Sequence, residues 1–216
     1  MTFSAIPWEE KQAALGELRG FHEQFAERSR FPDIGGSLSV RVGDFAPSDF
    51  YFAVASGGKN ISAPAPEGFL FVDAAGEPCE ATRLEPVADT PIHAKIYRMT
   101  GSGAIIHAHT VMNNVLSEYY GDEGYVPAQG IESIKELGIG EENAAIRVPI
   151  LPNHAEISAI AKRIPRALDT RIPGILLRGH GIYAWGQNAN EARCRLEAFE
   201  FIFEVLHRSI QLPPKR

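Results

Sequence analysis

Apolar positions along the chain follow two spacings, one typical of helices and one typical of strands. Residues 8–31 place apolar side chains on one helical face, which predicts an amphipathic opening helix. Short apolar runs bounded by turn residues predict strands at 37–41, 50–55, 69–73, 103–109 and 145–150, and a hairpin of 175–177 with 182–185. Further helices are predicted over 155–168 and at Thr90, Thr110 and Asn188, each of which is expected to cap the helix that it begins.

The connections between these elements indicate how the strands pair. Most of them are too short to be parallel crossovers, so we expect an α/β fold with a mixed, largely antiparallel central sheet covered by helices on both sides. The chain has no internal repeat and no low-complexity linker. Residues 1–216 are therefore expected to form a single domain.

Composition narrows the possible partners. A chain of 216 residues with 44% hydrophobic content can build a large core without disulfides, and two cysteines suit a reducing compartment. The net charge of −6 and the lack of a basic run argue against nucleic acid, although a local phosphate pocket remains compatible with an acidic surface. No signal-like or membrane-spanning stretch occurs, so we expect a cytoplasmic protein with no membrane partner.

Three histidines carry the clearest chemical signal. His107 and His109 lie two residues apart in a predicted strand, so both imidazoles can reach one cation. This pair alone fits two ordinary core or surface histidines equally well. His180, between glycines in a predicted turn, adds a third nitrogen and favours a zinc site with one open position, the arrangement of catalytic zinc.

The order of the motifs resembles that of the class II aldolase and adducin-head superfamily, over nearly the whole chain. The motifs are Gly35-Gly36-Ser37-Leu38-Ser39, Ser56-Gly57, the capped helix from Thr90, His107-Ala108-His109 and His180-Gly181. The resemblance implies a helix-covered mixed sheet and one zinc per subunit, held by His107, His109 and His180. It also implies a homotetramer with active sites near the subunit interfaces.

Residues 178–186 and 196–204 look closest to the dehydratase branch, which removes water from a methylthio-ketopentose phosphate in methionine salvage. That branch keeps its acid/base carboxylate in a Glu-x-Ile-Lys segment, so the resemblance implies a catalytic Glu132 in Glu132-Ser133-Ile134-Lys135. Without the resemblance, Glu132 would be interpreted as a solvated surface glutamate. The superfamily's aldolases keep a glutamate where this chain has Asp89, one methylene shorter, and the superfamily commonly has Asn where Ser37 stands.

Two segments could hold the phosphate of a small-molecule sugar phosphate. They offer backbone N–H groups, hydroxyls and one cation, and the expected substrate-binding residues are Gly36, Ser37, Ser56, Gly57 and Lys59, together with Asp89. The competing interpretation is that these glycines and serines only form turns.

Three functions are compatible with the sequence. The first is a dehydratase; the second is a zinc aldolase or epimerase, which would need its carboxylate near Asp89. The third is a non-catalytic interaction module, and the complete histidine set counts against it because a scaffold needs no open zinc.

Overall fold

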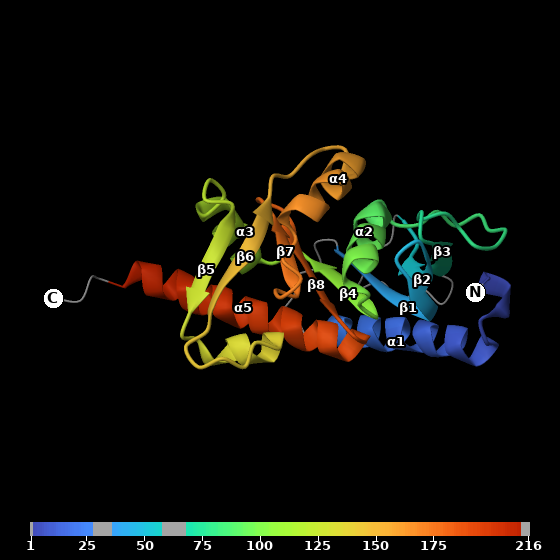
Figure 1. The fold of residues 1–216 in the computed structure, drawn as a ribbon, viewed down its shortest axis with the longest axis horizontal. Helices are drawn as coiled ribbons and strands as arrows, with labels where there is room; N and C mark the ends of the chain where they lie inside the picture. Colours follow the sequence, from blue (N-terminus) through green and yellow to red (C-terminus); the bar gives the residue numbers. More distant parts are fainter. Residues whose placement is uncertain (1, 28–35, 58–67, 213–216) are drawn as a thin grey trace.

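A mixed sheet runs through the middle of the molecule, with helices on both of its faces (Figure 1). The computed structural model describes residues 2–27, 36–57 and 68–212. Within them the strands are β1 (Gly36–Ala46), β2 (Asp49–Ala55), β3 (Phe69–Asp73), β4 (Ala104–Ala108), β5 (Tyr125–Gln129), β6 (Ala145–Leu151), β7 (Gly174–Leu177) and β8 (Gly181–Gly186). They form one eight-stranded sheet in the order β3-β2-β1-β4-β8-β7-β6-β5.

Strand direction agrees with the expectation from sequence. Among the described strands only β6 and β7 pair in parallel, and the other neighbours are antiparallel. The predicted hairpin is present as β7 and β8, joined by the turn that carries His180. The predicted α/β class and largely antiparallel sheet are therefore confirmed.

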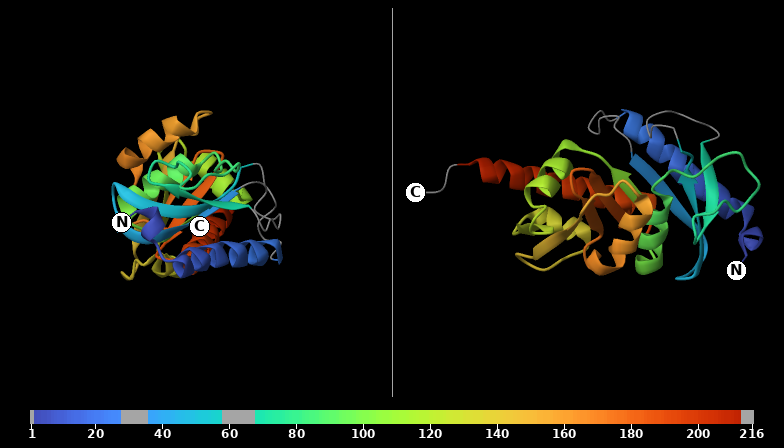
Figure 2. Two further views of the ribbon diagram at one scale, coloured as in Figure 1. Left: turned by 90° about the vertical axis from the view of Figure 1, so that its right-hand side faces the viewer. Right: turned by 90° about the horizontal axis from the view of Figure 1, so that it is seen from above.

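The helices form two layers, which Figure 2 shows from the side and from above. The helices with at least nine residues are α1 (Trp8–Glu27), α2 (Thr90–Thr100), α3 (Val111–Tyr119), α4 (Ile157–Ala167) and α5 (Ala189–Gln211); two short 3-10 turns are η1 (Phe3–Ala5) and η2 (Glu132–Leu137). Helices α1, α3 and α5 share one core with the sheet, while α2 and α4 share a second core on the opposite face. None of the described helices is both long and apolar enough to cross a membrane.

The burial of β4 on both faces decides which way its histidine points. Ile106 belongs to the core under α1 and α5, whereas Ile105 belongs to the core under α2 and α4. Side chains alternate along a strand, so His107 shares the face of Ile105 and lies toward α2. This places the first metal-ligand candidate beside the N-terminus of α2.

Several boundaries differ from the sequence-based predictions. Helix α2 has Asp89 as its N-cap and Thr90 as its first residue, whereas Thr90 was expected to be the cap. The opening helix is described as far as Glu27, and the rest of the predicted span 8–31 lies outside the described residues. Strand β5 was not predicted; it contains Pro127, which cannot donate a backbone hydrogen bond but is tolerated in an edge strand.

Candidate metal centre

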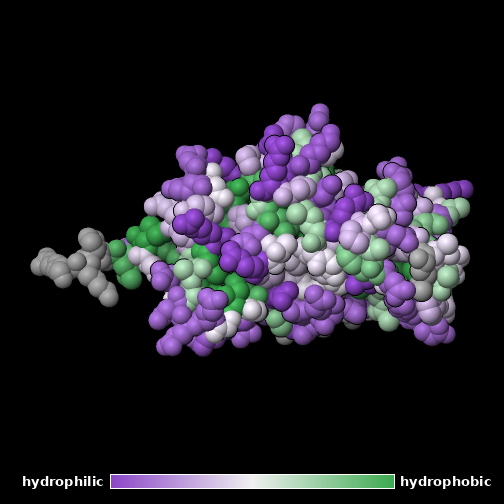
Figure 3. Space-filling model, viewed as in Figure 1, coloured by the Kyte–Doolittle hydropathy of each residue, from purple (hydrophilic) through white to green (hydrophobic). Residues whose placement is uncertain are grey.

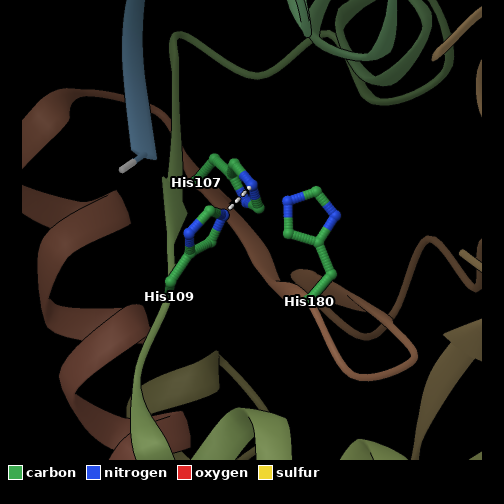
Figure 4. A group of neighbouring side chains, drawn as sticks. All are labelled: His107, His109 and His180. Atoms are coloured by element: carbon green, nitrogen blue, oxygen red, sulfur yellow. Dashed lines mark hydrogen bonds between the residues drawn. The ribbon is translucent and has the colours of Figure 1, made fainter. Parts of the chain in front are cut away.

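Three histidine side chains from two separate segments meet at one end of the sheet (Figure 4). His107 is in β4, His109 follows the last residue of that strand, and His180 is in the turn between β7 and β8. Antiparallel pairing of β4 with β8 brings the turn next to the end of β4. Their ligand atoms all lie within 4.8 Å of one another, and the two Nε2 atoms of His107 and His109 are 2.8 Å apart.

A glycine permits this close approach. A Cβ at Gly181 would lie 2.6 Å from the carbonyl oxygen of Ala108 and 2.6 Å from Cδ2 of His109. It would also lie 2.8 Å from Cε1 of His107. Gly181 is therefore required by packing against the ligand strand, because real Cβ atoms do not approach other heavy atoms so closely.

The hydrogen bonds favour metal binding over mutual packing of the histidines. His107 Nδ1 lies 3.0 Å from the carbonyl oxygen of Ile182, which can only accept, so Nδ1 carries the hydrogen and Nε2 offers a lone pair. Two imidazole nitrogens 2.8 Å apart repel unless a proton or a cation lies between them. Nδ1 of His180 is buried and has no hydrogen-bond partner among the described residues.

The protonation preferences of the imidazoles agree with this interpretation. Burial lowers the pKa of His107 to about 3, with the nearby Asp89 opposing the shift and His109 adding to it. Burial also lowers the pKa of His180. Both rings are therefore neutral near pH 7, the form that binds metal ions, and an all-imidazole set suits zinc.

An aromatic ring holds His107 in place. The ring of Tyr183 stacks on it with 4.0 Å between the ring centroids and an angle of 4° between the planes. The two residues are direct cross-strand partners of β4 and β8. Burial, followed by the proximity of Asp89, raises the pKa of Tyr183 well above its ordinary value, so its hydroxyl stays protonated and donates 3.1 Å to Asp89 Oδ2.

Asp89 is the acidic residue next to the histidines. Its Oδ2 accepts from Ser37 Oγ at 2.5 Å and lies 3.4 Å from His93 Nε2, in addition to the contact with Tyr183. Burial alone would raise the pKa of Asp89, but the neighbouring His93 and the hydrogen bonds hold the pKa below its usual range. Oδ1 of Asp89 is buried without a hydrogen-bond partner in the described chain, which leaves one carboxylate oxygen available for a ligand.

A chain of buried hydrogen bonds connects Asp89 to the core. Ser37 Oγ lies 2.8 Å from His93 Nε2, and His93 Nδ1 lies 2.7 Å from Ser39 Oγ. Ser39 Oγ in turn lies 2.8 Å from the hydroxyl of Tyr97. His93 is not among the site residues predicted from the sequence; its spacing of four residues from Asp89 is the signal that could have indicated this contact.

The predicted phosphate-binding residues are only partly brought together. Ser37 is directly opposite His107 in the pairing of β1 with β4, but its hydroxyl is engaged by Asp89 and His93. Ser56, at the same end of the sheet after β2, has a buried hydroxyl with no hydrogen-bond partner among the described residues. Gly57 donates its N–H to the carbonyl oxygen of Glu85.

Gly36 is partly exposed at the start of β1 and pairs with Ala108, beside the histidine strand. Lys59, the predicted cation of the phosphate site, lies outside the described residues. Ser56, with its unpartnered hydroxyl, and Gly36 therefore remain the described candidates for direct contact with a phosphate, and Gly57 follows Ser56 with its N–H engaged by Glu85.

Glu132 is not near the histidines of its own chain. Strand β5 leads away from the histidine end of the sheet, and Glu132 follows it in η2, which packs against α5. Four strand spacings separate β5 from β4, about 19 Å across the sheet at ~4.8 Å each. The Glu132 side chain is 84% exposed and forms an ion pair with Lys135 at 2.7 Å.

Comparison with known proteins connects this geometry to a family. The model of the Class II Aldolase and Adducin N-terminal domain matches residues 17–207. This chain belongs to the class II aldolase and adducin family. Among solved structures of this fold, L-fuculose-1-phosphate aldolase from Thermus thermophilus has a TM-score of 0.68 at 23% identity, covering 93% of this chain and 97% of that chain. An aldolase II superfamily protein from Pseudomonas syringae has a TM-score of 0.71 at 18% identity, with 98% and 84% covered.

Closer relatives within the family share one name. The methylthioribulose-1-phosphate dehydratase of Persephonella marina is 41% identical over 202 residues, which cover 94% of this chain and 93% of the relative. The protein of the same name from Bacillus subtilis is 42% identical over 194 residues, covering 89% and 91%. The resemblance inferred from the motifs is thereby confirmed, and within the family the chain groups with these dehydratases.

Proposed function

We propose that this protein is a lyase that dehydrates 5-methylthioribulose 1-phosphate to 2,3-diketo-5-methylthiopentyl 1-phosphate in methionine salvage. The observation that carries the proposal is the combination of a three-histidine cluster, with His107 buried, and relatives of this name at about 40% identity over nearly the whole chain. The solved structures share the fold at lower identity and support only the architecture.

The reaction requires one proton to be removed and one to be delivered. The C3 proton leaves to a base, because the C2 carbonyl makes it acidic, and the electron pair forms the C3–C4 double bond. The C4–O bond breaks, and the departing hydroxyl takes up a proton to leave as water. The resulting enol tautomerises to the second ketone, so atoms and charge balance without an oxidant.

We propose that His107, His109 and His180 hold one Zn²⁺ per subunit. Bound there, zinc would polarise the substrate carbonyl and stabilise the negative charge that develops when the proton leaves. The donor set supports this assignment because three imidazole nitrogens lie close together, and three protein ligands leave the fourth position of a tetrahedral zinc to an oxygen ligand.

Asp89 and Ser37 are proposed to act together on the substrate. The free Oδ1 of Asp89 can accept a hydrogen bond from a substrate hydroxyl, while Ser37 and Tyr183 hold Oδ2. In this arrangement Ser37 acts through Asp89 instead of meeting the phosphate with its hydroxyl. Gly36, Ser56, Gly57 and Lys59 are then the proposed phosphate-binding residues.

We propose Glu132 as the acid/base residue, acting on the histidine site of a neighbouring copy. The support is the family motif together with the distance of Glu132 from its own histidines. Exposed apolar side chains beside the site favour such a contact: Val111 and Tyr119 of α3 are 62% and 61% exposed, and α3 begins two residues after His109. In a homotetramer, each subunit would contribute its Glu132 to the histidine site of a neighbour, so that every site would be complete.

A second apolar region lies on α5. Figure 3 shows apolar atoms at its C-terminal end, where the helix extends past the sheet and Ile210 and Leu212 are exposed. Phe201 is 54% exposed, whereas Phe199 and Phe203 are buried in the core. These surfaces support a homo-oligomer. A cytoplasmic location and the lack of a nucleic-acid partner stay predictions from the sequence.

The decisive experiment is mass analysis of the products formed from 5-methylthioribulose 1-phosphate by the zinc-loaded protein. Loss of one water without cleavage of the carbon skeleton is the expected result. The alternative is an aldolase or epimerase, favoured by the position of Asp89 next to the histidines. Shorter carbonyl fragments, or an isomer of unchanged mass, would support that alternative and overturn the dehydratase proposal.

A further inference from the structure

Helix α3 lies between the two segments that carry the histidines. It begins two residues after His109 and contacts strands β7 and β8, whose connecting turn contains His180. Its first turn contains two consecutive asparagines, Asn113 and Asn114. Each of them contacts the backbone of a different ligand segment.

Asn113 holds the segment of His107 and His109. Its Nδ2 donates to the carbonyl oxygen of Ala108 at 3.1 Å, between the two histidines, and its Oδ1 accepts from the backbone N–H of Thr110 at 3.2 Å. The same Nδ2 lies 3.2 Å from Oε1 of Glu200 on α5. Asn113 is fully buried, so these contacts are protected from water.

Asn114 reaches the other segment. Its Nδ2 donates to the carbonyl oxygen of His180 at 2.9 Å, and it also lies 3.0 Å from the carbonyl oxygen of Thr110 and 3.1 Å from Oδ1 of Asn113. All three neighbours are oxygen acceptors, so the NH₂ group must face them. One amide group therefore connects the turn of His180 to the start of α3.

Strand neighbours also hold this turn: the backbone N–H of His180 donates to the carbonyl oxygen of Leu177 at 3.1 Å, and the N–H of Arg178 donates to that of Leu151 at 2.9 Å. The carbonyl oxygen of His180 is instead held by Asn114. The backbone N–H of Gly179 donates to Ser117 Oγ at 3.1 Å. Arg178 forms ion pairs with the exposed Glu118 and Asp122, which are worth little because solvent screens them. The ring of His180 has a buried Nδ1 without a partner in the described residues, so the position of that ring depends on how its backbone is held.

We infer that Asn114 is a positioning residue for the metal, because it fixes the backbone of His180 relative to His107 and His109. The inference rests on the proposed metal site. Figure 4 shows that His180 approaches the other two rings from a separate loop, so a small shift of this loop would open the three-nitrogen set. Groups that orient metal ligands typically contribute about 10-fold or more to metal affinity.

The test measures metal affinity instead of turnover. Asn114→Ala removes the donor and keeps good helix propensity, and Asn114→Leu removes the donor at nearly the same size. We expect each variant to bind Co²⁺ and Zn²⁺ about 10-fold more weakly in competition with a chelator. Asn190→Ala, an exposed asparagine of α5, is the matched control and should leave the affinity unchanged.

A double substitution distinguishes two roles of Asn114, positioning of His180 and stabilisation of α3 in general. In a His180→Ala protein the third ligand is already missing, so adding Asn114→Ala should cause no further loss of metal affinity if Asn114 acts through His180. Thermal unfolding in the presence of a chelator checks that every variant folds without metal.

Three results would overturn the inference. One is unchanged metal affinity in both Asn114 variants, and another is an equal loss of affinity in the presence and absence of His180. The third is unfolding of both metal-free variants, which would show that Asn114 supports the fold and not the ligand. If instead the unsubstituted protein binds no stoichiometric metal, the proposed metal site itself fails, and the two failures are distinguishable.

Discussion

The position of Glu132 leads to a prediction that a mixture of two inactive variants regains activity. Glu132→Gln cannot transfer a proton as a carboxyl does, and we expect it to lower dehydration by about 100-fold or more with the fold and metal intact. His107→Ala removes a metal ligand and should be inactive for a different reason. Neither chain can form a complete site with copies of itself.

The fraction of activity regained follows from the positions of β4 and β5 in the sheet. Because β5 lies four strands from β4 and leads away from the histidines, a site would take its histidines from one copy and its glutamate from the next. In a closed ring of randomly mixed chains, about one quarter of the sites would combine both intact parts. Hybrids should therefore show about a quarter of the unsubstituted activity.

The assay uses co-expression of the two variants with different tags, isolation of doubly tagged oligomers, and measurement of dehydration. A mixture of His107→Ala with His180→Ala is the matched control, because every site takes all its histidines from one chain and no recovery is possible. Doubly tagged oligomers of Glu132→Gln and His107→Ala that stay inactive would refute the assignment of Glu132 to a neighbouring site.

Four further outcomes are expected. Elemental analysis should find about one zinc per chain, lost on His107→Ala; full retention of zinc would contradict the site. Asp89→Asn should lower dehydration less than Glu132→Gln, and steady-state rates in the reverse order would indicate an aldolase-type mechanism. Burial raises the pKa of Glu200 to about 7 despite hydrogen bonds from Thr110 and Asn113, so the folded state binds the proton more tightly and loses stability as pH rises from about 4.5 to 7. Over that pH range the free energy of unfolding should fall by an amount on the order of 3 kcal/mol in the unsubstituted protein, and Glu200→Gln should abolish this decrease in denaturant titrations. An unchanged pH dependence in the variant would contradict this. Light scattering should give a homotetramer, and a monomer at micromolar concentration would exclude the shared site.

Local sequence signals were sufficient for most elements. The apolar spacing predicted the strands around His107 and His180 and the final helix, because alternation and helical stripes are set by burial of one face. Thr110 was correctly predicted as a helix cap, since it accepts from the N–H of Asn113 within one turn. Strand β5 escaped prediction because Pro127 interrupts it, and a proline within a short run is typical of a loop.

Long-range pairing determined what the sequence could not. That His107, His109 and His180 belong to one site could be inferred from the motifs, but their contact depends on the pairing of β4 with β8 and on the close approach at Gly181. Only the strand register shows that Tyr183 stacks on His107.

The residue types of the site are properties of the sequence, because three imidazoles and a buried carboxylate define the chemistry whatever their order. Which carboxylate reaches that chemistry is a property of the tertiary structure. Asp89 is next to the histidines because α2 begins beside β1 and β4, and Glu132 is remote because β5 lies at the far edge of the sheet. Sequence spacing cannot distinguish the two cases, since strand order and direction are set by packing between residues far apart in the chain.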